Sequence, residues 1–145
     1  MQHHPLIVAE PFGRYARKPP LVVDCSVLAA VLFDEPTREE AMIAMSGKAL
    51  FAPDLIHHEI LSVALKKLGK DNEEQMLRAL EDFAELDLTQ HATDPLSQFR
   101  LTHQTGLSAH DTAYLQLAIE LKAPLATFDK TLGTVAEQWL TDGGT

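Results

Sequence analysis

The chain has 145 residues, of which 46% are apolar, so it can bury the core of one domain of ordinary size. Its net charge is −9, from 21 acidic against 12 basic residues. That balance argues against a protein that coats nucleic acid, but not against an enzyme built on clustered carboxylates. A single cysteine excludes an internal disulfide and suits a reducing cytoplasm, and no apolar run approaches the roughly 18 residues of a membrane span.

The start of the chain differs in composition from the rest. The first 20 residues hold three basic residues against one acidic residue and end in Pro19-Pro20, which cannot continue a helix. They lack the long apolar stretch of a secretory signal. We therefore expect a flexible N-terminal extension over residues 1–20, one domain over 21–140 and a loose tail over 141–145.

Strands and helices alternate from Leu21 onward. The run LVVD (21–24) is short and β-branched, as in a buried parallel strand, and a second strand at 49–53 is stopped by Pro53. Helices are predicted at 26–33, at 36–45 and at 54–69. The last of these carries an apolar face and has Gly69 as its expected C-terminal cap.

The second half of the chain continues the alternation. Asp71 and Glu74 are spaced as a capping box for a helix that reaches about residue 84. The remaining predicted elements are an edge strand at 86–90, a helix at 94–106 closed by Gly106, a helix at 109–122 capped by Ser108, a strand at 123–128 and a helix within 130–140. This order predicts an α/β fold, a three-layer α/β/α sandwich around a mainly parallel sheet.

Four acidic residues stand out by their places in these elements. Ligands gather at the carboxyl ends of parallel strands, and Asp24 and Asp129 end the first and the last strand. Glu59 lies beside the apolar face of its helix, and Asp111 lies in the first turn of another. Four converging carboxylates raise one another's pKa unless a cation joins them. A hard divalent ion such as Mg²⁺ would resolve the conflict and could act on a phosphodiester.

Each acid also has a purely structural interpretation. Asp24 could cap the helix that follows it, Asp111 occupies the capping-box position after Ser108, and Asp129 could be a turn or cap residue. Glu59 is the hardest to explain in this way, because neither a cap nor a solvated face accounts for it. The residue types alone leave both interpretations open.

Taken in order, the segments VVDCSVLAAVLFDE, FAPDLIHHEILSVALKK and LSAHDTAYLQLAIELKAPLATFDKTLG resemble the PIN-domain family, specifically VapC-type toxins. The resemblance covers about residues 21 to 135. It implies a ribonuclease that depends on Mg²⁺ or Mn²⁺, acts on RNA, forms homodimers and is blocked by an antitoxin protein. It also implies that water, rather than a side chain, is the nucleophile.

The resemblance assigns roles to individual residues. The acidic set of the family falls on Asp24, Glu59, Asp111 and Asp129 as catalytic and metal-binding residues. Asp24 and Asp111 are expected to contact the metal directly, and the other two directly or through water. Ser26 and Thr127 match polar positions that support such a site. The alternative is a PIN-like module that binds RNA or protein without cutting.

Other site classes fit the sequence poorly. Haloacid dehalogenase-type phosphatases need a second Asp where this chain has Ser26, receiver domains need an acidic pair there, and nucleotide-binding loops need glycines that are absent. His57, His58 and His110 raise the question of zinc, but adjacent helical residues point apart and the HExxH spacing is missing. Cys25 is expected to be a small buried residue without a base to activate it.

Overall fold

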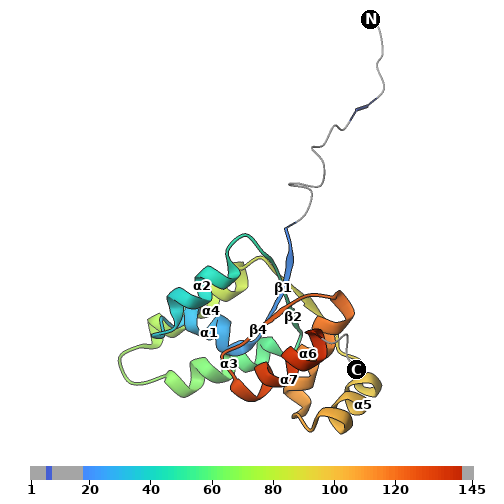
Figure 1. The fold of residues 1–145 in the computed structure, drawn as a ribbon. Helices are drawn as coiled ribbons and strands as arrows, with labels where there is room; N and C mark the ends of the chain where they lie inside the picture. The colour runs from blue at the N-terminus through green and yellow to red at the C-terminus, as the bar shows by residue number, and fades with distance from the viewer. Residues whose placement is uncertain (1–5, 8–17, 142–145) are drawn as a thin grey trace, which may run out of the picture.

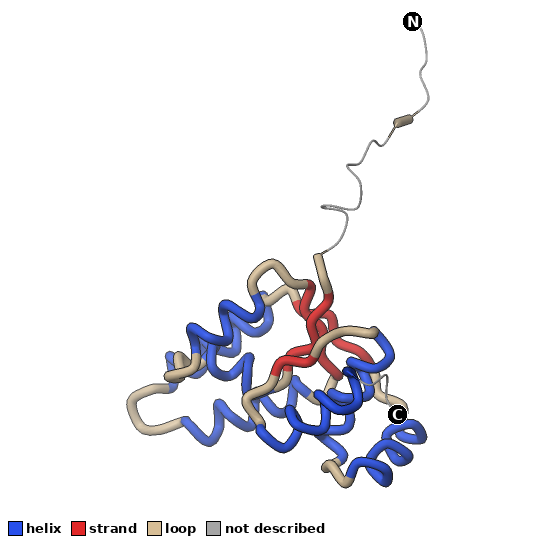
Figure 2. Tube along the Cα trace, viewed as in Figure 1, coloured by secondary structure: helices blue, strands red, loops and turns tan. Residues whose placement is uncertain are grey.

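A computed structural model describes residues 6–7 and 18–141 of the chain, so most of the predicted extension and nearly all of the predicted tail lie outside it. A central sheet separates two groups of helices (Figures 1 and 2). The strands are β1 (Pro20–Val23), β2 (Ala49–Pro53), β3 (Leu88–His91) and β4 (Leu125–Ala126). The helices are α1 (Cys25–Leu32), α2 (Arg38–Met45), α3 (Ile56–Lys67), α4 (Glu73–Glu85), α5 (Pro95–Thr105), α6 (Ala109–Leu121) and α7 (Lys130–Thr141).

The sheet has the strand order β3-β2-β1-β4, and every pair is parallel. Crossovers between parallel strands are right-handed, so the steps from β1 to β2 to β3 put α1–α4 on one side of the sheet. The return from β3 to β4 runs in the opposite direction and puts α5 and α6 on the other side, as Figure 1 shows. The predicted α/β sandwich is therefore confirmed. The direction reverses between β1 and β4, which is where ligands bind in open α/β sheets.

The core lies between the sheet and the helices that cover it. Val22 and Val23 of β1 are completely buried, as expected of a β-branched run in a parallel strand. The side chains of α6 are buried from Thr112 through Leu115 and again at Leu117 and Ala118, so most of its circumference faces other elements. Because α6 packs tightly against the sheet, the residues of its first turn are held firmly next to the strand ends.

Capping between α3 and α4 differs from the prediction. Gly69 does not close α3, because the helix already ends at Lys67 with Leu68 as its cap. The side-chain amide of Asn72 caps the C-terminal end of α3 instead. Its Nδ2 donates to the Lys67 carbonyl at 2.8 Å, and its Oδ1 accepts from the Gly69 N–H at 2.7 Å. Asn72 is also the N-cap residue of α4 by position, but its side chain makes no capping hydrogen bond to that helix. The predicted capping box of Asp71 and Glu74 is therefore wrong.

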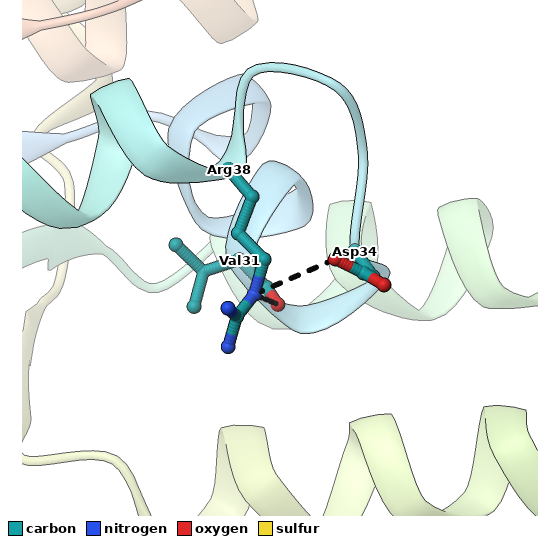
Figure 3. Close-up of polar contacts among 3 residues, drawn as sticks. All are labelled: Val31, Asp34 and Arg38. Carbon is teal, nitrogen blue, oxygen red and sulfur yellow. Dashed lines mark hydrogen bonds and ion pairs between the residues drawn. The ribbon is translucent and has the colours of Figure 1, made fainter.

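The turn after α1 is held by a long side chain from α2. Asp34 adopts a left-handed conformation, with φ of 52°, just past the helix end. Arg38 Nε donates to the Val31 carbonyl at 3.3 Å and lies 3.8 Å from Asp34 Oδ1 (Figure 3). A carbonyl at the open end of α1 thus gains a donor. The exposed ion pair adds little stability of its own.

Other helix ends match the sequence closely. Asp94 caps α5 through the Leu96 N–H, and Gly106 closes it in the left-handed conformation, with φ of 75°. Ser108 caps α6 as predicted, accepting from the Asp111 N–H at 3.1 Å. β3 is the predicted edge strand, whereas β4 pairs over only two residues of the six predicted.

The apolar face predicted for α3 is only partly used by the core. Ile56, Ile60 and Ala64 are buried, whereas Leu65 is 61% exposed and Leu61 and Leu68 are also exposed. Part of the predicted face is therefore available at the surface.

Within the part of the chain that the structure describes, none of the helices combines the length and the hydrophobicity needed to cross a membrane.

Candidate active site

Asp24 lies at the carboxyl end of β1, next to the point where the sheet reverses direction. The register of β1 and β4 pairs Val22 with Leu125 and Val23 with Ala126, and the Asp24 N–H donates to the Ala126 carbonyl at 3.2 Å. One step further along both strands, the side chains of Asp24 and Thr127 meet. The backbone pairing thus brings together residues 103 positions apart in the sequence.

Asp24 is only 6% exposed, and hydrogen-bond donors surround its carboxylate. Its Oδ1 accepts from the Ser26 hydroxyl at 2.6 Å and from the Val27 N–H at 3.2 Å, and its Oδ2 accepts from the Thr127 hydroxyl at 2.5 Å. Burial raises the pKa of Asp24, and these hydrogen bonds counter part of the rise. A carboxylate offers about four lone pairs. The Ser26 hydroxyl, the Val27 N–H and the Thr127 hydroxyl occupy three of them, and the Ser26 N–H also lies close enough to lower the pKa.

Glu59 is half-buried in the first turn of α3, at the same edge of the sheet. Its Oε1 accepts from the hydroxyl of Tyr114 on α6 at 2.5 Å. Burial raises the pKa of Glu59, and the charges of Asp24 and Asp111 raise it further, whereas the Tyr114 hydrogen bond and the nearby His110 lower it. Glu59 therefore lies within electrostatic range of two of the other predicted acids.

The charge of Asp111 is coupled to those of the other three acids. Its pKa is raised first by burial, then by the charge of Asp129, and also by Asp24. Its backbone N–H donates to the Ser108 hydroxyl at 3.1 Å, and a hydrogen bond between the Ser108 side chain and the Asp111 carboxylate counters part of the rise in pKa. Asp111 thus takes part in the cap of α6 while its carboxylate stays coupled to the charges of Asp129 and Asp24.

Asp129 is the most exposed of the four acids and has a structural role as well. Its Oδ1 accepts from the Leu132 N–H at 3.0 Å and so caps α7. Its own N–H donates to the Thr127 hydroxyl at 2.9 Å, and the Phe128 N–H donates to the Ser26 hydroxyl at 2.9 Å. Ser26 and Thr127 thus connect the segment after β4 to Asp24. Both predicted supporting residues lie at the site.

The four carboxylates form one electrostatic group without forming a tight cage. Across residues 6–7 and 18–141, no three His, Cys, Asp or Glu side chains are gathered closely enough to hold a metal ion between them. The charges nonetheless couple Asp111 to Asp24, Glu59 and Asp129. Mg²⁺ keeps several waters and commonly binds through one or two carboxylates together with substrate phosphate. The oxygen donors present fit such a partly hydrated ion.

The neighbouring Cys25 and the histidines do not form a second site. Burial and the charges of Glu59 and Asp24 raise the pKa of the Cys25 thiol to about 12, so it stays protonated near neutral pH and is a poor nucleophile. His57 and His58 are exposed and contact each other edge to face, with ring centroids 5.2 Å apart. The described residues therefore offer no arrangement typical of zinc.

One residue of the site was not predicted from the sequence. Tyr114 lies within the helix predicted at 109–122 and is only 2% exposed. A buried tyrosine hydroxyl nevertheless needs a hydrogen-bond partner. Tyr114 lies one helical turn after Asp111, so the spacing alone could have placed its hydroxyl near the acidic edge.

Comparisons with known proteins agree with this geometry. The sequence model of the PIN domain matches residues 21–138. Ribonuclease VapC3 from Pyrobaculum aerophilum is 32% identical over 119 residues, which cover 77% of this chain and 91% of the relative. The crystal structure of PAE2754 from Pyrobaculum aerophilum superposes with a TM-score of 0.59 at 20% identity, covering 86% of this chain and 94% of that one. The structural match concerns the fold alone.

Proposed function

The chain belongs to the PIN-domain family and is of the VapC type, and we propose that it is a metal-dependent endoribonuclease that hydrolyses RNA phosphodiester bonds. The observation that carries the proposal is the electrostatic coupling of Asp24, Glu59 and Asp111 at the carboxyl end of the sheet. Each has a raised pKa, so the site carries more negative charge than the protein alone stabilises. The name of the relative, ribonuclease VapC3, supports RNA as the substrate.

The cofactor in this proposal is Mg²⁺ or Mn²⁺, with Asp24 and Asp111 as direct ligands and Glu59 and Asp129 as ligands directly or through water. When bound, such an ion activates a water molecule and neutralises charge on the phosphodiester. The residues of the chain hold the carboxylates in place. Ser26 and Thr127 fix the orientation of Asp24, and Asp129 stays attached to α7 through one oxygen while the other remains free.

Binding of substrate RNA also requires basic side chains that contact its phosphates, and this acidic chain has few of them. The candidates are Lys66, Lys67, Lys70, Arg78 and Arg100. Lys67 is paired with Glu35 at 3.2 Å, which reduces its availability. Lys66 lies near enough to Cys25 to lower the pKa of that thiol, and Cys25 adjoins Asp24. Lys66 is therefore our first choice for a phosphate contact.

We further propose that the protein is the toxin of a toxin–antitoxin pair and forms a homodimer. Helix α4 buries Ala79 in the core but leaves Leu77 51% exposed, and α3 leaves Leu65 at the surface. Exposed leucines on neighbouring helices are the surface that we assign to protein contacts. Analytical ultracentrifugation of wild type and a Leu77→Lys variant tests this, because loss of the dimer in the variant alone is the expected result.

The function is tested by incubating total RNA with purified protein in Mg²⁺ or Mn²⁺ and mapping the fragment ends. Asp24→Asn removes the charge and keeps a side chain that caps helices as well as Asp does. Asp94→Asn is a matched control, because Asp94 caps α5 at an exposed position and none of the four acids is among the groups that shift its pKa. Discrete cleavage by wild type and Asp94→Asn, but not by Asp24→Asn or in EDTA, is expected.

Two outcomes would contradict the proposal in different ways. Cleavage that persists in Asp24→Asn would place the activity elsewhere or in a contaminant. A folded wild-type protein that binds RNA but never cleaves it, in either metal, would favour the non-cutting module. Retained RNA binding is therefore measured in parallel with cleavage.

A further inference from the structure

Tyr114 connects the two helices that carry Glu59 and Asp111. It lies on α6 three residues after Asp111, and its hydroxyl reaches across to Glu59 Oε1 on α3 at 2.5 Å. Tyr114 as a whole is 2% exposed, and it belongs to the hydrophobic core. One end of this side chain is thus fixed by packing, and the other contacts a candidate metal-binding carboxylate.

Packing of the hydrophobic core does not explain why residue 114 carries a hydroxyl. A phenylalanine would fill almost the same volume without introducing a buried polar atom that needs a partner. The partner here is a half-buried carboxylate at the site, 55 residues away in the sequence. A hydrogen bond to a charged acceptor is stronger and more directional than one between neutral groups. It therefore restricts the orientation that the flexible Glu59 side chain adopts.

The hydrogen bond also leaves Glu59 partly free. It is the one protein hydrogen bond that the Glu59 side chain makes within the described residues, and it involves Oε1, so Oε2 remains free for another ligand. Because Tyr114 lies on the same helix as Asp111, holding Glu59 by Tyr114 also fixes it relative to Asp111. The two carboxylates are then already oriented before any ion binds.

We propose that Tyr114 is a positioning residue that orients the Glu59 carboxylate for binding of a divalent cation. The inference rests on the proposed function, since it takes Glu59 as part of a metal site. Partners of metal-binding side chains typically change metal affinity by about 10–100-fold when they are removed. Loss of the Tyr114 hydroxyl is accordingly expected to weaken binding by an amount in that range without abolishing the fold.

The test measures Mn²⁺ binding to the purified full chain by calorimetry and by electron paramagnetic resonance, with no RNA present. Tyr114→Phe removes the hydroxyl and keeps the ring, and Tyr114→Met is a second hydroxyl-free replacement that adapts to irregular space if Phe packs poorly. Thr112→Val is the matched control. It removes a fully buried hydroxyl from the same helix, where that hydroxyl bonds to Thr102 and to carbonyls of its own helix rather than to a carboxylate.

A double-mutant cycle separates positioning from general destabilisation. Tyr114→Phe is expected to weaken Mn²⁺ binding about 10–100-fold in wild type and to have no effect in a Glu59→Ala background. Thr112→Val is expected to lower thermal stability while leaving Mn²⁺ affinity unchanged. Equal affinity of wild type and Tyr114→Phe, or the same loss with and without Glu59, would overturn the inference and leave the proposed function standing. A folded wild type that binds no Mn²⁺ would overturn the metal dependence and the inference together.

Discussion

Replacing Thr127 by Val removes one hydroxyl from the site and preserves the β-branched shape of the side chain. That hydroxyl donates to Asp24 Oδ2, and it accepts from the Asp129 N–H at 2.9 Å. The first bond reaches a buried carboxylate, and losing a hydrogen bond to a charged group costs about 1.5–3 kcal/mol. The second involves an exposed segment, where water replaces the hydroxyl at little cost.

The expected loss is measurable by urea unfolding in EDTA at neutral pH. For a chain of this length, about 1.5–3 kcal/mol corresponds to a Tm lower by ~3–12 °C. Thr134→Val is the matched control, because its hydroxyl donates to the Lys130 carbonyl within α7 at an exposed position. That variant is expected to stay within ~0.5 kcal/mol of wild type.

The pairing of Thr127 with Asp24 is tested by combining the substitutions. In an Asp24→Asn background the carboxylate is gone, so Thr127→Val should cost markedly less than in wild type. Thr127 and Thr134 variants of equal stability would refute the reasoning. So would an unchanged cost in the Asp24→Asn background, because the hydroxyl would then not act through the carboxylate.

Four further predictions follow from the same contacts. Mn²⁺ at about a hundred times its Kd should raise the free energy of unfolding of wild type by about 2.7 kcal/mol, and much less in Asp24→Asn, as followed by urea unfolding. In EDTA, Asp24→Asn should gain stability relative to wild type as pH rises above 3.8, the ordinary pKa of an aspartate. The raised pKa of Asp24 means that the folded wild type binds more protons than the unfolded chain, and it loses stability as that proton is released. Lys66→Ala should reduce the dependence of log affinity for single-stranded RNA on log salt by about 0.7, and an unchanged slope would exclude a phosphate contact. Gly106→Ala should cost about 1–2 kcal/mol because the position is left-handed, whereas Gly69→Ala, which is not, should cost nothing, as measured by thermal unfolding.

Local signals in the sequence were reliable where one residue had one role. Pro53 ends β2, Gly106 closes α5 and Ser108 caps α6, all as predicted. Prediction failed between α3 and α4 because the Asn72 amide bonds both the end of one helix and the turn that follows it. No propensity scale distinguishes that arrangement from a capping box at Asp71.

The candidate site was predictable in part because it depends on the ends of strands. The alternation of elements placed Asp24 and Asp129 at one edge of the sheet, and the coupled charges of Asp24, Glu59 and Asp111 agree with the convergence expected from the sequence. What the sequence could not supply was the register between β1 and β4, which makes Thr127 a partner of Asp24. The contact between Tyr114 and Glu59 likewise depends on the packing of α3 and α6 in three dimensions.

The structural and chemical interpretations of Asp24 need not exclude each other. As the N-cap of α1, the residue uses Oδ1 to accept from the Val27 N–H. Capping holds the carboxylate at the end of β1, and the Ser26 and Thr127 hydroxyls offset part of the cost of burying its charge. The same bonds fix the orientation of the buried carboxylate, which lies within electrostatic range of Glu59 and Asp111. A carboxylate without these bonds would have had more freedom to turn away from Glu59 and Asp111. The sequence order Asp-Cys-Ser-Val therefore serves the helix and the candidate site at once.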